Sequence, residues 1–385
     1  MRILITIATA CGQALYAVMK LAPVRRKVVL LSRQADRPSR DFRMLAEELE
    51  RRDPGLRVVT RCRFIRPGIL ARVAYFGEVL AQMWHLATSA VCVVDGYIVP
   101  VSVFTHRPEL TVIQMWHALG AIKRFGLQSV GREGGRSEGV AESMRMHRNY
   151  DVVICGGPDA VPAFAEAFSV SESQVLPLGL PRVDYVLEQA EPGAAEPPAI
   201  AELRARFPRL GDEGRTRVLY APTFRRGRAA AFDSVVRAFD DERYTLIVKP
   251  HDLVSAATSG AHVVDATGVD ALDLLTICDV AVTDYSAIAF EAAVADKPVH
   301  YFVPDIEEYR LERGLNIDPM LDMPEVSSES AEAVRARIDA GGDTALSAVR
   351  ELRRRYLPPA DGGTCTGRIA DLVAAKVEEG ASDGG

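Results

Sequence analysis

The sequence has few cysteines, and none of them is close to another. Its six cysteines among 385 residues form no C-x-x-C pair, and no histidine stands at zinc-finger spacing, which argues against a structural zinc site. The pattern predicts reduced, mostly buried thiols in a cytosolic compartment. The cysteines are Cys11, Cys62, Cys92, Cys155, Cys278 and Cys365.

Several common cofactor motifs are also missing. The sequence has no G-x-x-x-x-G-K-[ST] loop, no G-x-G-x-x-G fingerprint and no Asp-x-Asp pair of the kind that holds a nucleotide-bound metal. ATP hydrolysis and dinucleotide redox chemistry are therefore disfavoured, and we expect no cofactor and no bound metal. The net charge of -6 and the pI near 5.8 argue against a nucleic-acid-binding protein.

No apolar run makes a convincing membrane span. Residues 3–19 carry no charge and precede Lys20, Arg25, Arg26 and Lys27, but the run is short for about 30 Å of hydrocarbon and is diluted by Thr, Gly and Gln. An interfacial helix, a buried helix or strand, and a true span all remain open. Residues 69–86 have helical apolar spacing, typical of a helix packed on a sheet or of one facing a membrane.

Short β-branched runs alternate with helical patterns, which is typical of parallel sheets covered by helices. The runs at 28–31, 57–60, 90–94, 110–113 and 152–154 predict a first half, and those at 218–220, 245–248, 262–264, 280–282 and 299–301 predict a second. We therefore predict an α/β protein with two doubly wound, Rossmann-like domains. Its predicted parts are an N-terminal domain over 1–187, a Pro- and Ala-rich linker over 188–200, a C-terminal domain over 201–378 and a flexible tail over 379–385.

The strongest local signal is the polar turn that follows the run at 280–282. Asp284 and Ser286 stand between that run and a helical pattern, with Ser286 as the expected N-cap. Such a turn aims backbone N–H groups at an anion, so a diphosphate is one expected ligand. Glu291, further along the helix, is a candidate for ribose hydroxyls. The alternative is a capped structural helix with Glu291 facing solvent.

Two of the seven histidines directly follow predicted strands. His117 lies in Trp116-His117-Ala118-Leu119-Gly120, and His251 lies in Lys249-Pro250-His251-Asp252. Because ligands of open α/β sheets bind at strand ends, both are candidate catalytic residues. The others, His85, His106, His147, His262 and His300, are mostly expected to be structural, His147 least firmly.

A third strand-end turn supplies a hydroxyl and guanidinium groups suited to phosphate oxygens. Thr223 and Arg225 lie in this turn, in Tyr220-Ala221-Pro222-Thr223-Phe224-Arg225-Arg226-Gly227. Surface arginines are common, so an ordinary solvated turn is the alternative. Taken with the other strand-end turns, this segment favours binding of a phosphorylated ligand.

Eight segments in order resemble the CDP-glycerol glycerophosphotransferase family of teichoic acid and capsular polymer synthesis. The resemblance covers most of the chain. It rests on Val28-Val29-Leu30-Leu31-Ser32-Arg33-Gln34 with Ser39-Arg40-Asp41-Phe42, on Trp116-His117-Ala118-Leu119-Gly120, on His147-Arg148-Asn149-Tyr150-Asp151, on Gly179-Leu180-Pro181-Arg182, on Ala221-Pro222-Thr223-Phe224-Arg225, on Lys249-Pro250-His251, on Thr283-Asp284-Tyr285-Ser286, and on Arg313-Gly314-Leu315-Asn316-Ile317-Asp318.

The resemblance implies a GT-B-like fold whose two domains face a central cleft. It places acceptor handling and membrane association in the first domain and CDP-polyol binding in the second, at the cytoplasmic face of the membrane. The implied partners are CDP-glycerol or CDP-ribitol, a lipid-linked or polymer acceptor, and the membrane surface. Transfer of the polyol phosphate to an acceptor hydroxyl would release CMP.

The resemblance also implies roles for the candidate residues. His117 would be the general base, and the phosphates would be held by His251, Arg225, Thr223, Ser286 and Arg313. Asp284 would either orient an imidazole or serve as a structural turn carboxylate. Ala287 and Ala118-Leu119 depart from the pattern of many members, the latter toward primase-like ones. The alternatives are a nucleotide-sugar glycosyltransferase or an inactive scaffold of the same fold.

Overall fold

The computed structural model describes residues 2–66, 68–223, 229–249, 262–358 and 363–382. The chain forms two compact units. Unit 1 contains residues 1–118, 125–184 and 358–385, and unit 2 contains residues 119–124 and 185–357. Each unit is described by itself below.

Unit 1 is built on a six-stranded parallel sheet with the order β2-β1-β3-β4-β5-β6. Its middle strands are buried on both faces, which explains why their sequences are continuous apolar runs. The strands are β1 (Arg25–Ser32), β2 (Arg57–Cys62), β3 (Ser89–Val94), β4 (Thr111–Gln114), β5 (Val152–Ile154) and β6 (Val175–Leu176).

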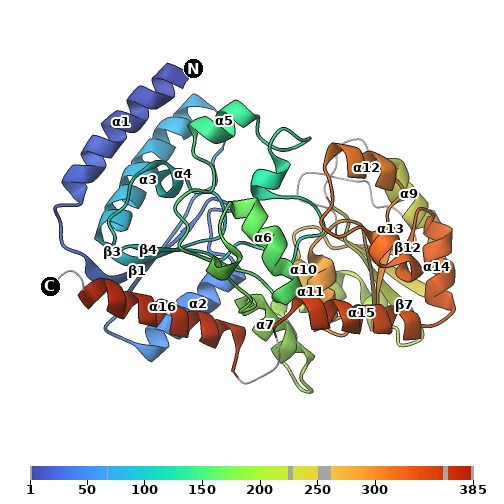
Figure 1. Ribbon diagram of the computed structural model, residues 1–385. Coiled ribbons are helices and arrows are strands. Elements are labelled where there is room, and N and C mark those ends of the chain that lie inside the picture. Colours follow the sequence, from blue (N-terminus) through green and yellow to red (C-terminus); the bar gives the residue numbers. More distant parts are fainter. Residues whose placement is uncertain (1, 67, 224–228, 250–261, 359–362, 383–385) are drawn as a thin grey trace. The chain divides into compact units, whose positions relative to one another are not determined.

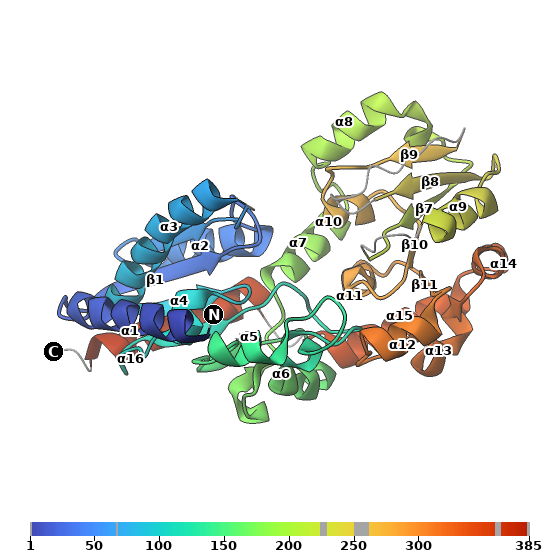
Figure 2. The same cartoon turned by 90° about the horizontal axis from the view of Figure 1, so that it is seen from above.

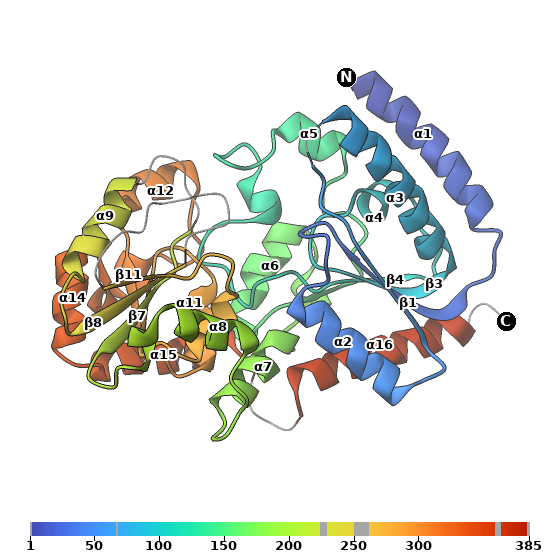
Figure 3. The same ribbon diagram turned by 180° about the vertical axis from the view of Figure 1, so that it is seen from behind.

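Helices cover both faces of this sheet. α2 (Arg40–Arg52) and α16 (Cys365–Ser382) lie side by side on one face, and α3 (Ile69–Thr88) and α4 (Val99–Val103) lie on the other (Figures 1 and 3). The remaining helices are α1 (Arg2–Met19), which packs outside α3, α5 (Glu138–Ser143), α6 (Val161–Phe168) and α7 (Pro181–Ala190), which leads into unit 2.

Unit 2 has a second six-stranded parallel sheet with the order β12-β11-β10-β7-β8-β9 (Figure 2). The strands are β7 (Thr216–Tyr220), β8 (Tyr244–Val248), β9 (Val263–Asp265), β10 (Val280–Thr283), β11 (Val299–Phe302) and β12 (Ser327–Ser328). Its helices are α8 (Pro198–Arg206), α9 (Ala229–Ala238), α10 (Ala271–Leu275), α11 (Ile288–Val294), α12 (Ile306–Glu312), α13 (Pro319–Asp322), α14 (Ala331–Asp339) and α15 (Asp343–Tyr356).

The core of unit 2 follows the alternation of its strands. Val218, Leu246 and Val282 point to one face and are buried together with Phe239, which follows α9, and Val334 of α14. Residues of the opposite parity face α11 and α15, which pack against each other. The doubly wound α/β fold predicted from the sequence is confirmed in both units.

All ten predicted strands are present, and two short ones were missed. β6 and β12 contain two residues each, too few to leave a periodic signal. Two segments are not where the predicted boundaries place them: residues 358–378 pack with unit 1, and residues 119–124 pack with unit 2. The predicted linker contains the end of α7 and the start of α8, and residues 379–382 of the predicted tail belong to α16.

The apolar N-terminal stretch is a helix with one buried face. Tyr16 is fully buried, stacks on Phe104 and hydrogen-bonds with His106 Nδ1 at 2.8 Å. Ile7 and Val18 are exposed by 55% and 63%, so the helix also presents apolar surface to solvent. No helix in the described part of the chain is both long and apolar enough to span a membrane.

Candidate functional site

The winding direction of unit 2 reverses between β7 and β10. The chain proceeds outward through β8 and β9 on one side and through β11 and β12 on the other. In open α/β sheets this switch point is where ligands bind, at the carboxyl ends of the strands. Thr223 follows β7 and Asp284 follows β10, so the sheet order brings together two of the predicted site residues.

The carboxylate of Asp284 connects these two turns through hydrogen bonds. This buried carboxylate accepts the backbone N–H of Thr223 at 2.8 Å and that of Tyr285 at 2.6 Å. Thr283 adds a bond from its hydroxyl to the carbonyl of Ala221 at 2.7 Å. These contacts favour the structural alternative for Asp284, because its carboxylate holds backbone on both sides of the switch point.

Unlike the carboxylate of Asp284, the buried Oγ1 of Thr223 has no hydrogen-bond partner among the described residues. A buried hydroxyl without a partner is costly, so its presence at a switch point indicates a ligand oxygen or water as its partner.

The structure corrects the expected N-cap. The N-cap of α11 is Ala287, and Ser286 Oγ reaches only Ile288 N, at a long 3.5 Å. Glu291 is also not solvent-facing, because only 3% of its surface is exposed. The exposed-glutamate alternative is therefore wrong, and Glu291 lies within the packed part of α11.

Residues 119–124, which follow His117 in the sequence, pair with the segment after Arg313. Arg124 N donates to Gly314 O at 3.0 Å, and Asn316 N donates to Ile122 O at 2.8 Å. An antiparallel bridge between Lys123 and Leu315 completes this pairing within unit 2. Two motifs far apart in the sequence are thus joined through their backbones.

Gly120 allows this segment to lie against α11. A Cβ at this position would stand 2.4 Å from Cζ of Phe290, a separation that real Cβ atoms essentially never show. Half-buried Arg313 ends α12 as its C-cap residue. Arg225 and His251 lie outside the described residues.

Unit 1 has its own switch point, between β1 and β3. Ser32 ends β1, Asp95 follows β3 and His117 follows β4, so these residues stand along one edge of the sheet. His117 Nδ1 lies 2.9 Å from the backbone carbonyl of Asp95. Gln34 Nε2 lies 3.3 Å from the same Nδ1. The shorter contact, to a carbonyl that only accepts, favours a proton on Nδ1 and a lone pair on Nε2, the tautomer that a general base needs.

Aromatic rings fix the turn that bears His117. Trp116 has a left-handed backbone (φ 56°), which costs about 1–3 kcal/mol for a residue with a bulky side chain. Its ring lies 4.1 Å from that of His117 and 5.3 Å from those of Phe125 and Phe168. This packing offsets the strain and restricts the orientation of the imidazole.

Asp95 is a site residue that the sequence analysis did not single out. It is 2% exposed, and burial raises the pKa of its carboxyl to about 7, assisted by the charge of Asp41 and opposed by a hydrogen bond from Ser32. The signal was present, because Asp95 directly follows a predicted strand as His117 does.

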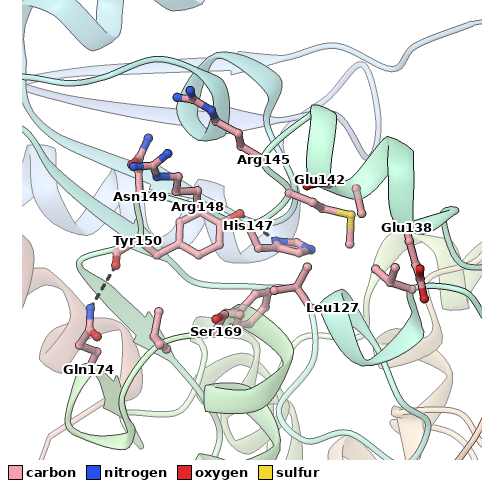
Figure 4. Close-up of a pocket in the computed structure, with 15 residues that line it drawn as sticks. Leu127, Glu138, Glu142, Arg145, His147, Arg148, Asn149, Tyr150, Ser169 and Gln174 are labelled. Atoms are coloured by element: carbon pink, nitrogen blue, oxygen red, sulfur yellow. Dashed lines mark hydrogen bonds between the residues drawn. The ribbon is translucent and has the colours of Figure 1, made fainter. Parts of the chain in front are cut away.

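A cavity of about 610 Å³ lies in unit 1, lined by parts of α5 and α6 and by the residues that precede β5 and β6. Figure 4 shows His147 among its lining residues, with Tyr150 and Ser169 nearby. His147 is buried, its Nδ1 lies 3.0 Å from the hydroxyl of Tyr150, and burial lowers its pKa to about 3. A neutral, hydrogen-bonded imidazole in an aromatic cluster matches the structural role expected for it.

Two doubly wound units, each with polar residues at its switch point, define a GT-B-like enzyme architecture. The solved structure of the wall teichoic acid polymerase TagF has the same fold, with a TM-score of 0.72, 19% identity and coverage of 98% of both chains. Residues 14–375 match the family model for CDP-glycerol:poly(glycerophosphate) glycerophosphotransferases. The chain belongs to this family.

Two relatives from Bacillus spizizenii differ in how much of their length is matched. The teichoic acid ribitol-phosphate primase is 31% identical, with 96% of both chains covered. The teichoic acid poly(ribitol-phosphate) polymerase is 28% identical over 79% of this chain, which spans only 49% of the polymerase. The family match favours a glycerophosphotransferase over the alternative of a nucleotide-sugar glycosyltransferase.

Proposed function

We propose that this protein transfers one polyol phosphate from a CDP-polyol to an acceptor hydroxyl in teichoic-acid-type polymer synthesis and releases CMP. The observation that supports it most directly is the contact of His117 Nδ1 with the carbonyl of Asp95, which favours Nε2 as the proton acceptor beside the switch point of unit 1. Full-length similarity to a primase, and partial similarity to a polymerase, favours addition of a single unit.

The reaction requires one proton transfer and one displacement at phosphorus. The acceptor hydroxyl gives its proton to Nε2 of His117, and its oxygen attacks the phosphorus that bears the polyol. The bond from that phosphorus to the bridging oxygen breaks, and CMP leaves with that oxygen. A base held in one orientation contributes both proton transfer and positioning.

A donor panel tests this proposal. The protein is incubated with a lipid-linked acceptor and, in turn, CDP-ribitol, CDP-glycerol and UDP-sugars, and products are weighed by mass spectrometry. We expect CMP release with a CDP-polyol and an acceptor heavier by one polyol phosphate. UDP release would indicate a glycosyltransferase, and no release from any donor would indicate a scaffold.

The donor-binding residues of the proposal are Thr223, Arg225, Ser286, Glu291, Arg313 and His251, and Asp284 positions the turn by holding the backbone of Thr223 and Tyr285. Thr223→Ala, Ser286→Ala and Arg225→Ala are each expected to weaken CDP-polyol binding by about tenfold to a hundredfold, since a contact to a charged group contributes roughly 1.5–3 kcal/mol. Calorimetry measures the affinity. Ser234→Ala, whose hydroxyl donates to Ala231 O in α9, is the control. Unchanged affinity in all three folded variants would contradict the assignment.

We also propose peripheral attachment to the cytoplasmic face of the membrane through α1. Ile7, Val18 and Leu21 are exposed, and Arg25 follows them at the surface. Lys27, expected to be among the lipid-facing cations, is buried beside Thr88 and does not take part. The surface therefore has fewer cations than the sequence suggested.

Sedimentation with anionic vesicles measures this attachment. Val18→Ser and Ile7→Ser are expected to reduce binding, and added salt to reduce it further, because each surface cation contributes about 1 kcal/mol and is screened. Leu311→Ser removes an even more exposed apolar side chain, 80% exposed, from unit 2 and should have no effect. Absence of vesicle binding by the wild type at low salt would exclude membrane attachment.

A further inference from the structure

Two arginines of unit 1 lie over the ring of the same tyrosine. Arg33 follows β1, Tyr97 lies just after β3, and Arg136 lies in the loop before α5. The guanidinium carbons of Arg33 and Arg136 are 5.6 Å and 5.7 Å from the centroid of Tyr97. We call Arg33 and Arg136 the arginine pair.

The arginine pair has no ion-pair partner within the described ranges of the chain. Two other half-buried arginines of unit 1 do have one: Arg61 pairs with Glu78, and Arg182 pairs with Asp41. The surroundings of Arg33 are phenolic instead, with Tyr75, Tyr97 and Tyr150 nearby. Burial lowers the pKa of Arg33, and the charge of Arg136 adds to this effect.

Half-buried Arg33 and exposed Arg136 hold two like charges over one tyrosine ring, and their repulsion costs free energy that an anion between them would offset. Cation–π contact with a buried tyrosine returns only part of that cost. Guanidinium groups bind phosphate oxygens through two parallel N–H donors, which makes an arginine pair well suited to a phosphate group. The arrangement therefore indicates an anion that is bound during function.

We propose that Arg33, Tyr97 and Arg136 form a site for a phosphate diester of the acceptor substrate. Ring contacts connect this site to the base: Tyr97 lies 5.7 Å from His147, His147 lies 6.1 Å from Trp116, and Trp116 lies 4.1 Å from His117. The molecule that gives its proton to His117 is the acceptor, so an anion bound beside this cluster belongs to it. This step rests on the proposed function.

The 610 Å³ cavity supports this placement. It shares His147 with the ring cluster, and a volume of this size accommodates a small polyol with its phosphate. Arg145, another lining residue (Figure 4), uses its guanidinium to donate to the carbonyl of Val103. The arginine pair is thus better disposed than Arg145 to bind an anion.

Direct binding tests the site without any turnover. The probe is bis(glycerol) phosphate, a phosphate diester, with glycerol as its neutral counterpart, and the measurement is calorimetry on the full chain. Arg33→Gln and Arg136→Gln are each expected to weaken diester binding by about tenfold to a hundredfold. The fold loss of diester affinity in the double variant should be smaller than the product of the two single-variant losses, because both side chains bind the same anion.

Two further variants keep the result interpretable. Arg132→Gln removes a charge from the same loop without a Tyr97 contact and should leave diester binding unchanged. Arg33→Lys keeps the charge but loses the planar fork, so an intermediate loss is expected. Arg136 is exposed, so its substitution leaves the core intact even where Arg33 variants are destabilised.

Other sources of the anion give different results. If the arginine pair binds the donor, CDP-polyol affinity falls equally in Arg33→Gln and Arg136→Gln, and the proposal is overturned. If it binds lipid headgroups, binding to phosphatidylglycerol vesicles falls while diester affinity does not, which also overturns it. If the wild type binds the diester no more tightly than it binds glycerol, the proposal is also overturned. Diester binding without CMP release from any CDP-polyol would instead reject the proposed function and leave the anion site standing.

Discussion

His117→Ala is expected to lower kcat by about 10²–10⁴-fold and to leave CDP-polyol affinity nearly unchanged. His117 lies in unit 1 with Nδ1 bound to the carbonyl of Asp95, which leaves Nε2 as the proton acceptor. A base that contacts the acceptor contributes to the chemical step and not to donor binding. Single-turnover kinetics measures the first quantity, and calorimetry with CDP-polyol measures the second.

The pH profile separates a base from a packing residue. A His117→Gln variant with native circular dichroism should lose the acidic limb of kcat/KM, since no imidazole remains to be protonated. His262→Ala is the control, because His262 contacts Arg215 at 3.3 Å in unit 2 and should leave turnover unchanged. An acidic limb that persists in His117→Gln would move the role of base to another residue. Normal turnover in that variant would reduce the Trp116-His117 turn to a packing feature.

The strand-end rule predicted much of the candidate site. Thr223, Asp284 and His117 follow strands whose apolar runs are clear in the sequence. Thr223 and Asp284 lie at the switch point of unit 2, and His117 follows β4, the neighbour of the switch-point strand β3 in unit 1. The strand order itself was not predicted in detail. This order makes β7 and β10 neighbours, and their adjacency brings the backbone N–H of Thr223 to the carboxylate of Asp284.

Some features depend on long-range packing that no local pattern specifies. α16 has an amphipathic sequence, but its pattern does not say which unit it covers, and it packs on α2 and β3 of unit 1. Ser286 has the right chemistry for an N-cap, yet helix α11 begins one residue later. Arg33 and Arg136 are brought together by Tyr97, a contact among three separate segments.

Asp95 shows how burial gives a residue properties that its identity does not suggest. Its carboxyl has a pKa raised to about 7, first by burial, whereas an unfolded aspartate titrates near 3.9. Between these values the folded protein retains a proton that the unfolded chain has lost. The free energy of unfolding therefore falls as pH rises from about 4 to about 7, and the contribution is constant outside that window.

Asp95→Asn is expected to remove this pH dependence, because an amide stays neutral. Relative to the variant, the wild type should lose roughly 3 kcal/mol of unfolding free energy between about pH 5 and pH 8. Three histidines, His147 and His300 buried and His85 half-buried, act in the opposite sense, since burial lowers the pKa of His85 and His300 to about 4 and of His147 to about 3. They favour the folded state as pH rises toward about 6.5, but they are present in both proteins and cancel in the difference.

Urea unfolding followed by tryptophan fluorescence is the appropriate measurement for Asp95→Asn. Both tryptophans, Trp84 and Trp116, lie in unit 1 with Asp95, so the signal reports the unit that contains the substitution. Asp240→Asn, at an exposed position of unit 2, controls for the loss of a carboxyl group elsewhere. Wild-type and Asp95→Asn unfolding free energies that run parallel from pH 5 to pH 8 would show that Asp95 is ionised in the folded protein. Its carboxylate would then have to be stabilised by Ser32 and Arg182 more strongly than its burial is unfavourable.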